Sequence, residues 1–225
     1  MALWGSIVGQ LVFGAIADHW GRRIVFIATC VLVIFGSLGS AASYPLGSFS
    51  IYDTLAMWRF FLGFGVGGEY PLSATVTSES SSPQLRGKLL AATFCMQGWG
   101  KLMSPIVILV LLNSGANLET VWRIGLAAGA LPGIIVFYFR WRMHETEDGQ
   151  RRQTPEHDAK CAGQTGLKIF WPALIGTAGT WFIQDITFYG NGLFSGTFTQ
   201  IMGLGEGLNA KALNVLYVEL IALPG

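Results

Sequence analysis

Charged side chains are scarce in this chain of 225 residues, in which Asp, Glu, Lys and Arg make up 12% of the sequence and hydrophobic residues 52%. Soluble domains carry about 25% charged residues, so the composition argues against a soluble globular fold. The net charge is only +1, and no basic stripe with interleaved aromatic residues runs along the sequence. This charge distribution argues against a nucleic-acid partner.

Cysteine is also rare, and its positions exclude further classes of protein. Cys30 and Cys95 lie in apolar segments and Cys161 in a polar one, so neither a disulfide framework nor a metal cluster is indicated. The sequence shows no nucleophile paired with a base and no set of metal ligands. We therefore predict no enzymatic activity, no metal and no cofactor.

Long apolar runs are abundant instead. Six runs have 17 residues or more, and a shorter seventh follows: Met1–Ala17, Ile24–Tyr44, Thr54–Val76, Leu89–Leu112, Val121–Phe139, Ile169–Phe198 and Ala212–Gly225. Each of the six can cross a hydrocarbon core of about 30 Å as a helix. The predicted fold class is therefore all-α, a helix bundle that spans the lipid bilayer about seven times, with the last span incomplete.

The basic residues predict the orientation in the membrane. Ten of the fourteen Lys and Arg follow the first, third and fifth runs: Arg22, Arg23, Arg86, Lys88, Arg140, Arg142, Arg151, Arg152, Lys160 and Lys168. The opposite loops, Pro45–Ile51 and Asn113–Thr120, contain none. The positive-inside rule places the basic loops, including Cys161, in the cytosol and the amino terminus outside.

The charge pattern also divides the chain into three parts. Residues 1–139 form a first helix bundle, and residues 169–225 begin a second one. Residues 140–168 are polar and have almost no apolar anchor, so we predict that they form a cytosolic linker between the bundles.

The segment GQLVFGAIADHWGRR, residues 9–23, contains the first motif. Gly9 and Gly14 would let neighbouring helices approach, and Asp18 would join Arg22 and Arg23 in a charged cluster at the membrane face. A positive-inside turn accounts for the two arginines but not for Asp18 and Gly21 at their spacing. The segment resembles the loop signature of the major facilitator superfamily, G-x-x-x-D-x-x-G-R-R/K, matched by Gly14, Asp18, Gly21, Arg22 and Arg23.

A second motif is RFFLGFGVGG, residues 59–68. Arg59 lies inside an apolar run, where a central arginine costs roughly 2.5–3.5 kcal/mol, or snorkels toward the outer surface. Gly63, Gly65 and Gly67 would form a groove for another helix. The segment resembles the R-x-x-x-G-x-G-x-G motif in the fourth helix of the superfamily, which is linked to proton coupling.

The stretch GGEYPLSATVTSE, residues 67–79, resembles one particular family within the superfamily. It is similar to the signature G-G-D-Y-P-L-S-A-T-x-x-S-E of the phosphate:proton symporter family, with Glu69 in place of Asp. The resemblance implies that Tyr70 donates to a phosphate oxygen. It implies the same contact for Gln97, 27 residues further on in FCMQGWG.

The segment TWFIQDITFYG adds Trp181, Asp185 and Tyr189, spaced by four and so on one helical face. An isolated acid in an apolar span is by itself a candidate functional residue. The same family carries W-x-x-x-D-x-x-x-Y in its seventh helix, which implies a phosphate site. The matches run from the second to the eighth helix of a twelve-helix transporter. We therefore expect a partial major facilitator fold, a fragment that does not transport alone.

The resemblance predicts uptake of inorganic phosphate with protons by alternating access, in the plasma membrane. Protonation of Asp185 would remove its repulsion of the anion, with Glu69 and Arg59 as further residues of the proton path. Lys101 departs from this pattern: it pairs with an acid such as Glu69, attracts the anion, or snorkels outward. The alternatives are another facilitator that carries sugars or organic anions, a phosphate sensor, and a non-functional fragment.

Overall fold

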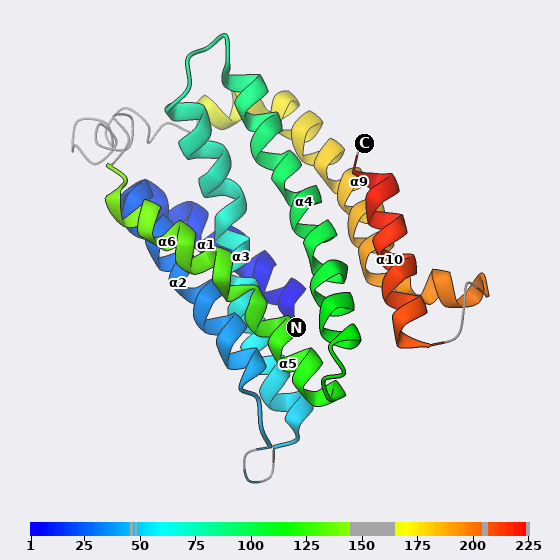
Figure 1. The fold of residues 1–225 in the computed structure, drawn as a ribbon. Helices are drawn as coiled ribbons and strands as arrows, with labels where there is room; N and C mark the ends of the chain where they lie inside the picture. Colours follow the sequence, from blue (N-terminus) through cyan, green and yellow to red (C-terminus); the bar gives the residue numbers. More distant parts are fainter. Residues whose placement is uncertain (46, 48, 145–164, 204–206, 224–225) are drawn as a thin grey trace. The chain divides into compact units, whose positions relative to one another are not determined.

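The computed structural model describes residues 1–45, 47, 49–144, 165–203 and 207–223, and these residues fold into α-helices without a strand (Figure 1). This confirms the predicted all-α class. The helices are α1 (Ala2–Trp20), α2 (Arg22–Ala41), α3 (Ile51–Glu79), α4 (Arg86–Asn113), α5 (Leu118–Ala128), α6 (Ala130–Arg142), α9 (Thr165–Ile201) and α10 (Leu208–Ala222).

Each of the seven predicted apolar runs coincides with helical structure, and the fifth run is divided between α5 and α6. Three helical stretches of the described residues are long and apolar enough to cross a membrane: Arg22–Ala41, Arg86–Asn113 and Leu118–Arg142, which comprises α5 and α6. Of the other helices, α10 has only 15 residues, and α3 contains glycines and polar side chains at Gly63–Tyr70 and Ser73–Glu79.

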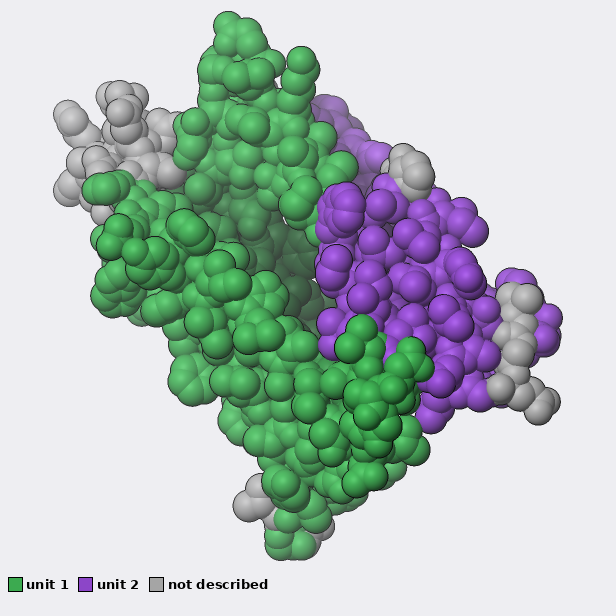
Figure 2. Space-filling model, in the orientation of Figure 1, with its two compact units in different colours: residues 1–97, 110–154 green, residues 98–109, 155–225 purple. Residues whose placement is uncertain are grey.

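The chain consists of two compact units, shown in different colours in Figure 2. The first comprises residues 1–97 and 110–154, and the second residues 98–109 and 155–225. Most of the predicted cytosolic linker, residues 145–164 with Cys161, lies outside the described residues. The three-part division made from the sequence and the orientation in the membrane stay predictions.

The core of the first unit lies among α1, α2 and α3. Helix α3 packs along both α1 and α2, and α2 also packs against α5 and α6 (Figure 1). The buried side chains at the centre are Phe13, Ala17, Val25, Phe26 and Leu72. This core brings α3, which carries the longest of the sequence motifs, into the middle of the unit.

Glycines set the spacing around α3. A Cβ atom at Gly63 would overlap the carbonyl oxygen of Ala2 on α1, and one at Gly67 would overlap the carbonyl oxygen of Ser6. A Cβ atom at Gly65 would instead lie 3.0 Å from the carbonyl oxygen of Thr29 on α2. The predicted groove is therefore present, and its alternate glycines receive two different helices, as small residues do where membrane helices pack closely.

The two glycines predicted to admit a neighbour to α1 behave differently. A Cβ atom at Gly9 would overlap the carbonyl oxygen of Phe64 on α3. A Cβ atom at Gly14 would have no atom of another helix within 4 Å, so the prediction was wrong for Gly14. The reason is a cavity of about 270 Å³ beside it, lined by Gly14, Ala17, Asp18, Arg22, Pro71, Leu72 and Thr75.

This contrast gives a paired prediction. Gly9→Ala is expected to destabilise the protein by about 1–3 kcal/mol, because the α1 and α3 backbones must separate to admit the methyl group. Gly14→Ala is expected to be neutral or to stabilise by up to about 1 kcal/mol, because alanine is the better helix former and has room. Thermal unfolding of both variants in the same detergent measures the difference, and equal losses would contradict the packing described above.

Candidate substrate site and its charged surroundings

Two of the predicted phosphate contacts meet in the first unit. The side-chain amide of Gln97 on α4 donates to the hydroxyl oxygen of Tyr70 on α3, with Nε2 and Oη 2.7 Å apart. Both side chains are partly buried. A tyrosine hydroxyl and a glutamine amide are both groups that can donate to an anion. Sequence spacing alone does not bring two residues 27 positions apart together; the long side chains of Tyr70 on α3 and Gln97 on α4 reach one another in the folded unit.

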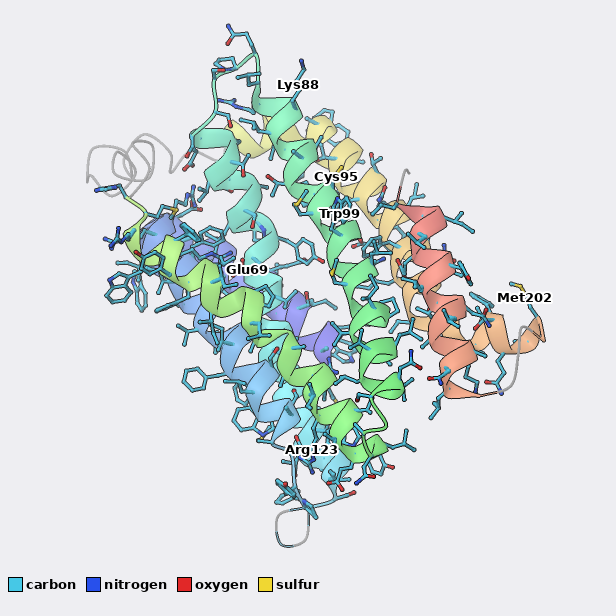
Figure 3. All side chains as sticks on the ribbon, in the orientation of Figure 1. Glu69, Lys88, Cys95, Trp99, Arg123 and Met202 are labelled. Atoms are coloured by element: carbon cyan, nitrogen blue, oxygen red, sulfur yellow. The ribbon has the colours of Figure 1, made fainter. Side chains whose placement is uncertain are left out.

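Successive residues of a helix lie about 100° apart around its axis. The Glu69 side chain therefore faces different helices from those that the Tyr70 side chain faces. Its carboxylate accepts two hydrogen bonds from Arg140 on α6, at 2.6 and 2.5 Å, and one from the Thr29 hydroxyl on α2, at 2.7 Å. Figure 3 labels Glu69 on α3. The paired geometry is the strongest form of arginine–carboxylate contact.

Arg140 is further held by Phe26. Its guanidinium donates to the Phe26 carbonyl oxygen at 3.1 Å and lies 3.6 Å from the centre of the Phe26 ring. The arginine side chain is 13% exposed and the glutamate side chain 22%. Glu69 is therefore a neutralised carboxylate within the bundle, and pairing between Glu69 and Lys101, one of the alternatives from the sequence, was wrong.

Arg22 lies at the centre of a second charged cluster. It donates to Asp18 at 2.9 Å and to Glu79, at the end of α3, at 3.2 Å. The side chains of Arg22 and Glu79 are 6% and 8% exposed, whereas Asp18 is 52% exposed. Gly21 joins α1 to α2 with φ 91°, a backbone conformation that favours glycine. Arg23 donates instead to the Trp141 carbonyl oxygen at 2.8 Å.

Arg59 lies apart from both clusters. Ten residues separate it from Glu69 on α3, which corresponds to about 15 Å along the helix. It is partly buried, one turn before Gly63 and the close contact with α1. The roles of Glu69 and Arg59 in moving protons stay a prediction.

The remaining predicted contacts lie in the second unit. Trp181, Asp185 and Tyr189 are all on α9, and their spacing of four places them on one face of that helix. Asp185 and Tyr189 are partly buried, while Trp181 is 47% exposed. A hydrogen-bond donor, an acid and a second donor thus follow one another along a single helical face.

Lys101 contacts the same helix. Its ammonium lies 3.2 Å from the centre of the Phe188 ring, a cation–π contact. A lysine in the middle of a membrane helix costs roughly 2.5–3.5 kcal/mol, whereas such a contact contributes about 0.5–2 kcal/mol. The ring therefore offsets only part of the cost of Lys101.

Sequence reasoning missed the partners in each charged group. Arg140 was assigned to the cytosolic linker, Glu79 and Thr29 were given no role, and Phe188 was not singled out. One signal was available: an acid inside an apolar helix needs a basic partner, and few basic residues lie in or next to the apolar runs. Which of them reaches Glu69 follows only from the packing of α2, α3 and α6.

The chain matches the profile of a protein family described as sugar (and other) transporter over residues 1–168. A probable inorganic phosphate transporter of Oryza sativa subsp. japonica, 1-12, is 34% identical over 96% of this chain and 49% of its own length. The low affinity inorganic phosphate transporter 5 of Petunia hybrida is 32% identical over the same shares.

Solved structures show the same fold at lower sequence identity. A D-xylose-proton symporter superposes with a TM-score of 0.75 and 20% identity, covering 99% of this chain and 54% of the symporter. A proton:xylose symporter of the major facilitator superfamily, bound to 6-bromo-6-deoxy-D-glucose, superposes with a TM-score of 0.78 and 21% identity. The superposition covers 99% of this chain and 56% of that symporter.

The chain spans about half the length of the curated relatives it matches. The family profile covers most of the chain, including both glycine motifs and the Tyr70–Gln97 pair. The chain therefore belongs to the sugar (and other) transporter family, and it is similar over nearly all its length to plant inorganic phosphate transporters.

Proposed function

We propose that this chain is the substrate-binding part of a carrier that moves inorganic phosphate across a membrane together with protons. The observation that carries the proposal is the hydrogen bond between Tyr70 and Gln97, two donors that the resemblance assigns to phosphate. It occurs in a chain whose relatives are named as inorganic phosphate transporters. The plasma membrane is the proposed location, and a fluorescent fusion tests it.

Phosphate is held in this proposal mainly by neutral donors. Tyr70, Gln97, Trp181 and Tyr189 offer hydroxyl, amide and indole hydrogens. Neutral donors bind an anion without the strong attraction of several fixed cations, so the anion can also leave. Alternating access of the two helix bundles around these residues would release it on the other side.

Protons enter through Asp185. An ionised carboxylate repels phosphate strongly in a site of low dielectric constant, and protonation both removes the repulsion and adds a donor. Proton and phosphate then increase each other's affinity, which is the thermodynamic requirement for symport. Glu69 differs from Asp185 because Arg140 already neutralises it, which leaves Asp185 as the proposed coupling acid.

A sugar carrier is the second candidate, because the family description names sugars and the superposed structures are xylose symporters. Those structures are 20–21% identical to this chain and support the fold alone. An ionised Asp185 would repel phosphate but not a neutral sugar, so protonation of Asp185 is expected to raise the affinity for phosphate more than the affinity for a sugar.

Uptake by a chimeric carrier tests the proposal. In the chimera this chain replaces the matching 47% of inorganic phosphate transporter 1-11 of Oryza sativa subsp. japonica, to which it is 34% identical. Proteoliposomes with an inward proton gradient are expected to accumulate radiolabelled phosphate, and unlabelled phosphate but not xylose should compete. Accumulation of xylose instead of phosphate would contradict the proposal, and the rice transporter with its own sequence is the positive control.

A further inference from the structure

Lys101 lies against the face of α9 that carries Asp185. Asp185, Phe188, Tyr189 and Gly192 are spaced by three and four, so they share one face of that helix. The Lys101 ammonium is 3.2 Å from the centre of the Phe188 ring. A Cβ atom at Gly192, one turn further on, would lie 3.9 Å from the Lys101 nitrogen, so the side chain extends along this face.

On its own helix Lys101 is one turn from Gln97. Four residues correspond to a rise of about 6 Å, and positions four apart lie on the same face of a helix. Gln97 is the residue that donates to Tyr70. Helix α4 therefore presents the amide and the ammonium in succession, and the ammonium contacts the α9 face with the acid.

The contacts of Lys101 leave its charge largely uncompensated. The ion pairs among the described residues join Arg22, Arg123 and Arg140 to carboxylates and do not include Lys101. Glu219 on α10 acts on Lys101 electrostatically without forming such a pair. The Phe188 ring covers one side of the ammonium, and N–H donors remain on the others.

We propose that Lys101 is a further phosphate-binding residue, whose ammonium donates to a phosphate oxygen beside Asp185. The inference rests on the proposed function and makes it more specific, because a lysine binds phosphate as a point charge. Lys101 would favour an anion over a neutral sugar and the phosphate dianion over the monoanion. Among the described residues, Glu219 on α10 is the carboxylate that acts electrostatically on Lys101.

Phosphate binding to this chain in lipid nanodiscs tests the inference, with phosphorus NMR titration as the measurement. Lys101→Met is expected to weaken binding about tenfold or more, the effect of losing a charged hydrogen bond. The loss should be larger at a pH at which the dianion predominates. Lys101→Arg keeps the charge and should bind within a few-fold of the unsubstituted chain. Lys88→Met, at the exposed start of the same helix (Figure 3), is the matched control and should bind unchanged.

Glu219→Gln separates the inference from a purely structural role. If Lys101 binds phosphate, removal of the nearby carboxylate should leave the affinity unchanged or raise it, while Lys101→Met lowers it. If Lys101 only stabilises packing with Glu219, both variants should lower the unfolding temperature and neither should change the affinity, and that result would overturn the inference. Absence of phosphate binding by the unsubstituted chain would overturn the proposed function as well. If the unsubstituted chain binds phosphate and Lys101→Met binds it equally well, the role of Lys101 is refuted and the proposed function is not.

Discussion

Asp185→Asn is expected to abolish proton-driven accumulation of phosphate by the chimeric carrier, with a loss of at least about a hundredfold. Asparagine has the size of aspartic acid but neither charge nor a titratable proton, so phosphate binding no longer depends on protonation of this side chain. Exchange of external for internal phosphate should persist, because the amide resembles the protonated acid. Uptake with and without an imposed proton gradient, together with counterflow, measures the two activities.

The matched control for this variant is Glu119→Gln. Glu119 is 67% exposed and pairs with Arg123 on the surface of α5, far in sequence from the α9 face. Its neutralisation should leave both accumulation and exchange unchanged, since exposed ion pairs contribute little. Full gradient-dependent accumulation by Asp185→Asn would show that the coupling acid is elsewhere.

The second large effect concerns stability. Arg140→Ala is expected to destabilise the protein by at most about 3–5 kcal/mol, which is the usual cost of leaving one charge of a fully buried pair without its partner, because these two side chains are 13% and 22% exposed. Thr29 would remain as the only described donor to the Glu69 carboxylate. Loss of the cation contact with Phe26 adds to the effect. Thermal or denaturant unfolding in detergent measures it.

A double substitution shows whether the pair itself is the cause. In the Glu69→Gln, Arg140→Ala protein no charge is left unpaired, so its stability should exceed that of Arg140→Ala alone, as a double-mutant cycle requires for interacting residues. Arg142→Ala is the control on the same helix, because the Arg142 side chain is exposed and its guanidinium lies 5.0 Å from the centre of the Tyr138 ring. Additive effects of Glu69→Gln and Arg140→Ala would contradict the direct interaction.

Much of the architecture follows from local features of the sequence. Apolar runs of 17 residues or more specify the helices, because such lengths suit a span. Pro71, Pro105 and Pro172 lie within these runs and do not end α3, α4 or α9. Gly21 marks the turn between α1 and α2, and the spacing of Gly63, Gly65 and Gly67 predicts close helix packing. These features depend only on neighbours within a few turns of helix.

Partners across the bundle could not be predicted in the same way. Arg140 lies 71 positions from Glu69, and Arg22 lies 57 positions from Glu79. The charge pattern of the sequence predicts that Arg140 belongs to the cytosolic linker. In the structure α6 continues to Arg142, and Arg140 pairs with Glu69 on α3. Lys101 had three plausible environments, and its contact with the Phe188 ring was not among them.

The glycines of α3 have a mechanical consequence for any carrier built on this unit. Helix α1 fits against Gly63 and Gly67 on one side, and α2 fits against Gly65 on the other. A turn of α3 about its own axis by one residue would drive Leu62 or Phe64 into the backbone of α1. These close contacts oppose axial rotation of α3, so we expect α1, α2 and α3 to move together as one group. A displacement at Tyr70 would then also displace the helix ends at which Arg22 and Glu79 meet.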